Sequence, residues 1–171
     1  YNLNMPVEKN VFIIMGVSGC GKSTLGIALA KFLEIPFFDG DDFHPPGNIQ
    51  KMSKGVPLED SDREPWLTRL NKVAAKHQGQ GAVIACSALK ETYRQLLQNG
   101  LEENIIWVYL YGTYQELLER VSRRSTHYMP PALLQSQFDA LESPQYGIHI
   151  PVSLSVDEAI TKISEASKSS G

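Results

Sequence analysis

The first apolar run of the chain is followed at once by Gly16-Val17-Ser18-Gly19-Cys20-Gly21-Lys22-Ser23, which matches the pattern G-x-x-x-x-G-K-[ST]. Glycines let the backbone curl so that successive N–H groups point at one centre, where phosphate oxygens bind. The apolar run at 11–15 predicts a strand before the loop, and the spacing of leucines in 25–33 predicts a helix after it. Strand, loop and helix in this order are the context that a phosphate-binding loop requires.

Apolar runs recur along the chain and predict strands at residues 11–15, 36–38, 82–86, 105–110 and 148–150. Three of these runs are nearly continuous, which is typical of strands that are covered on both faces. Segments with helical spacing lie between the runs, at residues 25–33, 66–74 and 114–121, and another follows the last run at 156–163. This alternation predicts an α/β fold, a doubly wound parallel sheet between two layers of helices.

Several helix ends are marked in the sequence. A short helix is expected from about Gly47 to Lys54, with Gly55 as its stop. Ser61-x-x-Glu64 and Ser155-x-x-Glu158 are each expected to open a helix as a capping box, the first with Pro65 in its first turn.

Size and charge limit the class of protein. The chain has 171 residues, which predicts a single domain, 1–171, and 16 Lys+Arg against 19 Asp+Glu give a net charge of −3. This balance is too acidic for the broad basic face of general nucleic-acid binding. No run approaches the roughly 18 apolar residues that span a bilayer. Two cysteines do not make a disulfide framework. We expect a cytoplasmic protein with no nucleic-acid or membrane partner.

The loop predicts a site for ATP and Mg²⁺. The residues expected to bind the ATP phosphates are Gly16, Val17, Ser18, Gly19, Cys20, Gly21, Lys22, Ser23 and Thr24. Lys22 is expected to reach the β- and γ-phosphates, and the Ser23 hydroxyl to coordinate Mg²⁺. The alternative is a glycine-rich turn without a ligand. The motif does not define the reaction, because kinases, ATPases and GTP-dependent switches share it.

Acidic residues follow the second predicted strand as Asp39-Gly40-Asp41-Asp42. In a parallel sheet the carboxyl ends of the strands share one edge, so these carboxylates are expected to face the γ-phosphate. One carboxylate could hold the metal through water, a role given to Asp39, while another orients an attacking hydroxyl. The alternative is a solvated acidic turn, and the spacing does not divide the roles.

The connection at about 40–60 is rich in Gly, Pro, Asp and Lys, and we expect it to bind the second substrate. In or beside it lie the substrate candidates His44, Lys51 and Arg63. His44 could equally be a surface turn residue. Arg63 could be an exposed ion-pair partner within the acidic group 59–64.

The third predicted strand ends in Cys86-Ser87-Ala88-Leu89-Lys90. Cys86 is interpreted as a buried thiol. Ser87 and Lys90 lie within reach of phosphate or acceptor, and Arg94, one turn into the next helix, is a candidate for gripping an anion.

Arg120, Arg123 and Arg124 come at the end of a predicted helix, before an irregular segment. Cations at a helix C-terminus complement its dipole without any ligand. Three guanidinium groups beside a phosphate loop also suit a mobile cover, and we expect such a lid at about 120–131.

Taken together, these motifs resemble the gluconate kinases of the short P-loop type, which are related to shikimate and nucleoside-monophosphate kinases. The resemblance covers residues 11–144 and includes Phe43-His44-Pro45, Asp62-Arg63-x-Pro65-Trp66-Leu67, Cys86-Ser87-Ala88-Leu89-Lys90 and Leu133-Leu134-x-Ser136-Gln137-Phe138. It implies transfer of phosphate from ATP to the 6-hydroxyl of D-gluconate, a five-stranded sheet and a homodimer.

By position, the resemblance implies that Asp41 is the carboxylate next to the acceptor hydroxyl and that Arg120 and Arg124 are lid arginines, which with Lys22 are the expected catalytic residues. The chain departs from the family pattern at Pro151-Val152-Ser153, where acidic residues are common. A kinase of shikimate or of a nucleoside monophosphate remains an alternative. A GTP-dependent switch is another, although the chain has no Asn-Lys-x-Asp run for guanine recognition.

Overall fold

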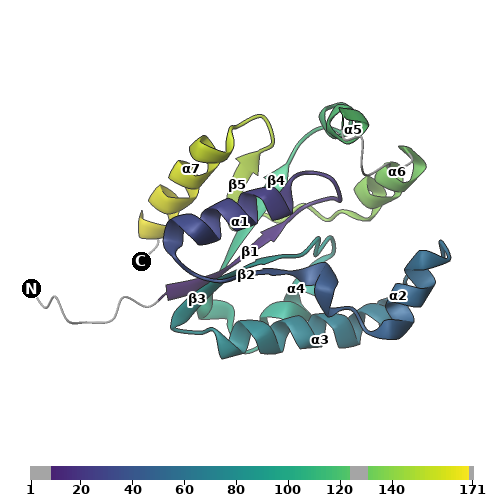
Figure 1. Cartoon of the computed structure of the whole chain (residues 1–171), viewed down its shortest axis with the longest axis horizontal. Helices are drawn as coiled ribbons and strands as arrows, with labels where there is room; N and C mark the ends of the chain where they lie inside the picture. Colours follow the sequence, from purple (N-terminus) through teal and green to yellow (C-terminus); the bar gives the residue numbers. More distant parts are fainter. Residues whose placement is uncertain (1–8, 124–130, 170–171) are drawn as a thin grey trace, which may run out of the picture.

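The computed structural model describes residues 9–123 and 131–169 (Figure 1). In these residues five strands form one parallel sheet in the order β2-β3-β1-β4-β5. The strands are β1 (Lys9–Met15), β2 (Phe37–Asp39), β3 (Gln80–Ala85), β4 (Ile105–Tyr111) and β5 (Ile148–Pro151). The predicted doubly wound parallel sheet is confirmed.

Strand β1 lies at the centre of the sheet, between β3 and β4. Ile13 is opposite Ile84 of β3 and Trp107 of β4. Because every pairing is parallel, all five strands end at the same edge, where the loop after β1 also lies.

Helices cover both faces of the sheet. They are α1 (Lys22–Leu33), α2 (Pro46–Ser53), α3 (Asp60–Lys76), α4 (Glu91–Gln98), α5 (Tyr114–Arg123), α6 (Pro131–Ala140) and α7 (Val156–Ser169), with short 3₁₀ helices η1 (Gly40–Phe43) and η2 (Glu102–Asn104). Figure 1 shows α1 and α7 on one face of the sheet and α3 and α4 on the other. No helix of the described residues is long and apolar enough to cross a membrane.

Each face of the sheet has its own buried cluster. On one side Ile13 of β1 packs in a cluster with Leu70 of α3 and Leu97 of α4. On the other side Ile14 belongs to a cluster with Leu29 of α1 and Ile160 of α7. Successive residues of a strand point to opposite faces, so burial on both sides requires the continuous apolar run of the sequence.

The helix ends follow the sequence in two of three cases. Helix α2 and its stop are confirmed: Gly55 has φ +71°, and the following amide, of Val56, donates to the carbonyl of Lys51. Ser155 and Glu158 form the expected capping box of α7.

The expected cap at Ser61 is wrong. Helix α3 begins at Asp60, because Glu59 and Asp62 form the capping box instead. Pro65 therefore lies beyond the first turn of α3.

Candidate active site

The loop Gly16–Ser23 connects β1 to α1 in the predicted order. A Cβ on Gly16 would lie 2.5 Å from the carbonyl oxygen of Leu110, so only glycine fits at this close approach to β4. The Gly16 amide donates to the carbonyl of Ser87 at 3.3 Å. Lys22 folds back over the loop, where its Nζ donates to the carbonyl of Val17 at 3.1 Å. The loop is thus held between the ends of β3 and β4.

A cavity of about 160 Å³ opens at this loop and brings together most residues expected at the phosphates. Its lining residues are Ser18, Gly19, Gly21, Lys22, Ser23, Thr24, Asp39, Asp41, Ala85, Cys86 and Ser87. They come from the loop, the first turn of α1 and the carboxyl ends of β2 and β3. Asp39, Asp41 and Ser87 thus lie beside the loop, as expected from the shared edge of the strands, whereas Asp42 does not line the cavity.

Ser23 and Asp39 supply a pair of oxygen donors on one wall of the cavity. Ser23 Oγ donates to Asp39 Oδ2 at 3.2 Å, and Asp39 Oδ1 accepts from the Asp41 amide at 3.0 Å. Oxygen ligands, few in number and completed by water and phosphate, are what Mg²⁺ prefers. Within residues 9–123 and 131–169 no group of three or more His, Cys, Asp or Glu side chains could hold a metal by itself.

Asp41 is an exposed residue, yet the pKa of its carboxyl departs from that of an ordinary surface aspartate. Desolvation raises the pKa of the Asp41 carboxyl, and the charge of Asp39 raises it further, while Lys22 and His44 oppose these effects. The pKa is therefore moved towards the range in which a carboxylate accepts a proton efficiently.

His44 is buried, with 6% of its surface exposed, so it is not the surface turn residue of the alternative interpretation. Its ring stacks on Trp66 at 4.0 Å between centroids, and Trp66 donates from Nε1 to the carbonyl of Gly40 at 2.7 Å. Desolvation lowers the pKa of His44, although the charge of Asp41 opposes this. The imidazole is therefore favoured in its neutral form.

Asn48 selects the tautomer of that ring. Its Nδ2 donates to the carbonyl of Asp62 at 2.9 Å, which fixes the orientation of the amide, because a carbonyl only accepts. The same Nδ2 lies 3.1 Å from Nδ1 of His44. Nδ1 is thus the acceptor, and neutral His44 carries its hydrogen on Nε2. Sequence reasoning gave no role to Asn48 or Trp66.

Lys51 and Arg63 are both held by neighbours. Lys51 Nζ pairs with Asp62 Oδ2 at 2.8 Å, and this hydrogen bond raises the pKa of Lys51 and lowers that of Asp62. Arg63 Nη1 donates to the carbonyl of Leu58 at 2.8 Å and to Tyr93 Oη at 3.3 Å. Arg63 also pairs with Asp60 at 3.8 Å, as the ion-pair alternative expected, but it is half-buried rather than exposed.

Tyr93 connects Arg63 to the loop after β3. Its Oη donates to Asp60 Oδ1 at 2.6 Å, and the guanidinium of Arg63 and the ammonium of Lys90 lie 5.3 and 5.7 Å from the centre of its ring. Burial first, and then the bond to Asp60, raise the pKa of Tyr93 to about 12. The phenol thus stays protonated beside these two cations.

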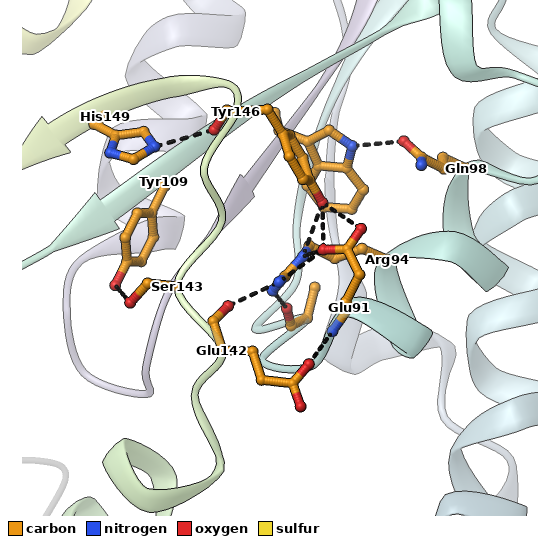
Figure 2. A network of polar contacts seen from close by, with 10 residues as sticks. Glu91, Arg94, Gln98, Tyr109, Glu142, Ser143, Tyr146 and His149 are labelled. Atoms are coloured by element: carbon orange, nitrogen blue, oxygen red, sulfur yellow. Dashed lines mark hydrogen bonds and ion pairs between the residues drawn. The ribbon is translucent and has the colours of Figure 1, made fainter.

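Arg94 does not grip an anion in the site, and that expectation is wrong. Only 1% of its surface is exposed. Its guanidinium donates to the carbonyls of Ala88 and Glu142, both at 2.7 Å, and pairs with the Glu91 carboxylate at 3.0 Å. Figure 2 shows Arg94 enclosed by this network, in which the Tyr146 hydroxyl donates to the Glu91 carboxylate. Its donors are used inside the protein because they satisfy carbonyls from two loops.

A larger cavity, of about 520 Å³, borders the same network but not the phosphate loop. Two of its lining carboxylates are bonded within the protein: Glu91 to Arg94, and Glu102 to the amide of Gly100 at 3.2 Å. We therefore do not place the active site there.

The two cysteines are buried, as Cys86 was expected to be. Burial raises the pKa of the Cys86 thiol to about 12, and burial also raises the pKa of Cys20. Neither thiol has the lowered pKa of a nucleophile.

Arg120 lies on α5 and reaches across to the end of β5, where it donates to the carbonyl of Val152. It lines a third cavity, of about 90 Å³, together with Cys20, Gly21 and Thr24. This third cavity and the cavity at the phosphate loop share Gly21 and Thr24, so the two flank the start of α1. Arg124, and most of the lid expected at 120–131, lie outside the described residues.

Comparisons with known proteins agree with this geometry. The family model for shikimate kinase matches residues 18–165. The thermosensitive gluconokinase of Escherichia coli (strain K12) is 44% identical over 156 residues, covering 90% of this chain and 83% of that protein. The gluconokinase of Gluconobacter oxydans (strain 621H) is 42% identical over 146 residues, covering 84% of this chain and 82% of that protein.

A solved structure shows the same fold. The crystal structure of a gluconokinase from Sinorhizobium meliloti 1021 superposes with a TM-score of 0.85 and 37% identity, covering 94% of each chain. Fold and site together define a P-loop kinase that acts on an alcohol group. The chain belongs to the shikimate kinase family and, within it, to the gluconokinases.

Proposed function

We propose that the protein catalyses the transfer of the γ-phosphoryl group of ATP to the 6-hydroxyl of D-gluconate, giving 6-phospho-D-gluconate and ADP. The observation that carries the proposal is one cavity that holds Lys22 and Asp41 together with the Ser23–Asp39 pair. Phosphoryl transfer needs little covalent chemistry from the protein, but it needs a cation at the phosphates and a base at the acceptor. Membership of the gluconokinases supports the choice of acceptor.

The phosphates of ATP would lie against the N-terminus of α1. Amides of residues 19 and 21–24 would be the donors there, because the Cys20 amide already donates to the carbonyl of Val17, and the dipole of a 12-residue helix adds to them. Lys22 neutralises charge on the β- and γ-phosphates. Arg120 enters from α5 on the other side of Thr24. The third cavity, of about 90 Å³, offers a surface for the adenine ring through its apolar side chains Leu25, Ile150, Val152 and Leu154.

The donor set at the carboxyl end of β2 fits Mg²⁺. Ser23 Oγ would coordinate the ion directly, and Asp39 would hold it through water, since both present oxygen atoms at one point of the cavity. When bound, the ion supplies positive charge that stabilises the phosphates during transfer.

Asp41 is proposed as the base. As the 6-oxygen of gluconate forms its bond to the γ-phosphorus, the bond from that phosphorus to the β–γ bridging oxygen breaks and ADP leaves. The proton of the hydroxyl passes to the Asp41 carboxylate. Its raised pKa makes it a better proton acceptor than an unperturbed aspartate.

The sugar acid itself carries a carboxylate and several hydroxyls. The Nε2–H of neutral His44 is a hydrogen-bond donor, and Arg63 and Lys90, both beside Tyr93, are cations for the carboxylate. Ser87 lines the cavity that holds Lys22 and Asp41. Lys51 is proposed to act through its ion pair, which fastens α2 to the start of α3.

We further propose a cytoplasmic homodimer. The support is the resemblance to the gluconate kinases, and sedimentation of the purified chain tests the oligomeric state.

An acceptor panel tests the function. ADP release is measured by a coupled assay with gluconate, shikimate, AMP or CMP at equal concentrations of ATP. Turnover with gluconate at least 100-fold above the other acceptors is expected. Turnover with shikimate or a nucleotide alone would transfer the assignment to another acceptor, and slow GTP hydrolysis without any acceptor would indicate a switch.

A further inference from the structure

A side chain that is distant in sequence is hydrogen-bonded to the phosphate loop. Gln137 of α6 accepts a hydrogen bond from the Ser18 amide through Oε1 at 2.6 Å, and its Nε2 donates to Ser18 Oγ at 2.8 Å. The two residues are 119 positions apart. Both polar groups of one amide side chain are thus used on one residue of the loop. The Ser18 amide, expected to bind phosphate, has another partner.

The loop has few other bonds of its own in this region. Within it the Cys20 amide donates to the carbonyl of Val17 at 3.3 Å, and Lys22 donates to the same carbonyl. A glycine-rich segment loses more conformational freedom than others when it is ordered. The bonds from Gln137 therefore order the loop before a nucleotide arrives, which lowers the entropic cost of binding.

Helix α6 is itself firmly attached. Leu134 is buried with 1% of its surface exposed, and the ring of Phe138 meets that of Tyr114 of α5 edge-on at 5.8 Å. Beyond its C-terminus, the Glu142 amide donates to the carbonyl of Leu89 at 2.8 Å. The helix thus contacts the phosphate loop, and the segment after it is bonded to the loop after β3.

We propose that Gln137 is a positioning residue for nucleotide binding, which acts through Ser18 and touches neither ATP nor the acceptor. It fixes the middle of the loop relative to α6, so that the amides of residues 19 and 21–24 face the phosphates. The proposal deepens the proposed function and rests on the loop as the nucleotide site. It gives a role to a residue of the motif at 133–138 to which sequence reasoning assigned none.

Titration with ADP tests the proposal without any acceptor. Gln137→Met keeps the length of the side chain and removes both hydrogen bonds. Isothermal titration of this variant is expected to show about 10-fold weaker ADP binding, the loss that two modest hydrogen bonds provide. In turnover, KM for ATP rises to a similar extent while KM for gluconate stays within twofold. If the wild-type chain ignores gluconate, the proposed function fails and the ADP titration still decides the role of Gln137.

Gln135→Met is the matched control. Gln135 is exposed on the same helix, and within the described residues its side-chain amide donates to Asp139 of α6, not to the phosphate loop. It is expected to bind ADP like the wild type. Ser18→Ala removes one of the two bonds, so its effect and that of Gln137→Met are expected to be less than additive. Wild-type ADP affinity in Gln137→Met, or strictly additive effects, would overturn the proposal. Thermal melting identifies a variant that fails to fold, and the Ser18→Ala titration then decides alone.

Discussion

Ser23 Oγ lies 3.2 Å from Asp39 Oδ2, in a hydrogen bond that joins the first turn of α1 to the carboxyl end of β2. The two residues are 16 positions apart in the sequence. The parallel sheet brings them together because β1 and β2 both end at this edge. The pair forms the proposed magnesium site.

Asp39→Asn is expected to raise the Mg²⁺ concentration for half-maximal turnover about 10-fold, the usual effect of losing a residue that orients a metal through a ligand or water. The measurement is the rate of ADP release at saturating ATP and gluconate against free Mg²⁺. An unchanged Mg²⁺ requirement would remove Asp39 from the metal site.

Asp41→Asn is expected to lower kcat by at least about 100-fold, because the amide cannot accept the proton of the hydroxyl. ATP affinity should change little. Asp42→Asn is the control, since Asp42 is exposed like Asp41 but does not line the cavity. Turnover of Asp41→Asn within tenfold of the wild type would exclude Asp41 as the base.

The same substitution has an effect on stability whose sign follows from the pKa. The folded state raises the pKa of Asp41, first by desolvation, so ionised Asp41 destabilises the fold at neutral pH. Asp41→Asn should therefore melt at the same or a higher temperature than the wild type at pH 7. The difference should shrink as the pH falls below the ordinary range of an aspartate, where both states are protonated. A variant that melts lower at pH 7 would contradict the electrostatic account.

Arg94→Met is expected to destabilise the protein by about 3 kcal/mol, since it leaves buried carbonyls and the Glu91 carboxylate without their partner. Urea unfolding measures the loss, and Arg69→Met, on the exposed side of α3, is the control. A stable Arg94→Met protein with a raised KM for gluconate would restore Arg94 to the substrate site.

The parts of the site that sequence reasoning placed correctly depend on local pattern or on topology. The loop at 16–23 is one contiguous motif. Asp39 ends β2 and Ser87 follows β3, and the parallel order of these strands brings both residues to one edge. Arg94 could not be assigned in this way, because its burial depends on the carbonyl of Glu142, 48 residues away. The contact between Ser18 and Gln137 has no sequence signal either, since neither periodicity nor spacing reports a bond across 119 residues.

Lys51 is intermediate between these cases. Its place in the connection after β2 predicted a substrate residue, whereas the structure pairs it with Asp62, which also caps α3. In the sequence, a lysine that pairs with a nearby aspartate looks the same as a lysine that binds an anionic substrate. Only the three-dimensional arrangement distinguishes the two roles.

The most direct test of the account is the identity of the product. Purified protein is incubated with Mg²⁺, ATP and D-gluconate, and the product is analysed by proton–phosphorus correlation NMR. The account predicts one phosphomonoester coupled to the two protons on carbon 6, formed in equal amount to ADP. ADP formed without any phosphorylated gluconate, or phosphate on another carbon, would contradict it.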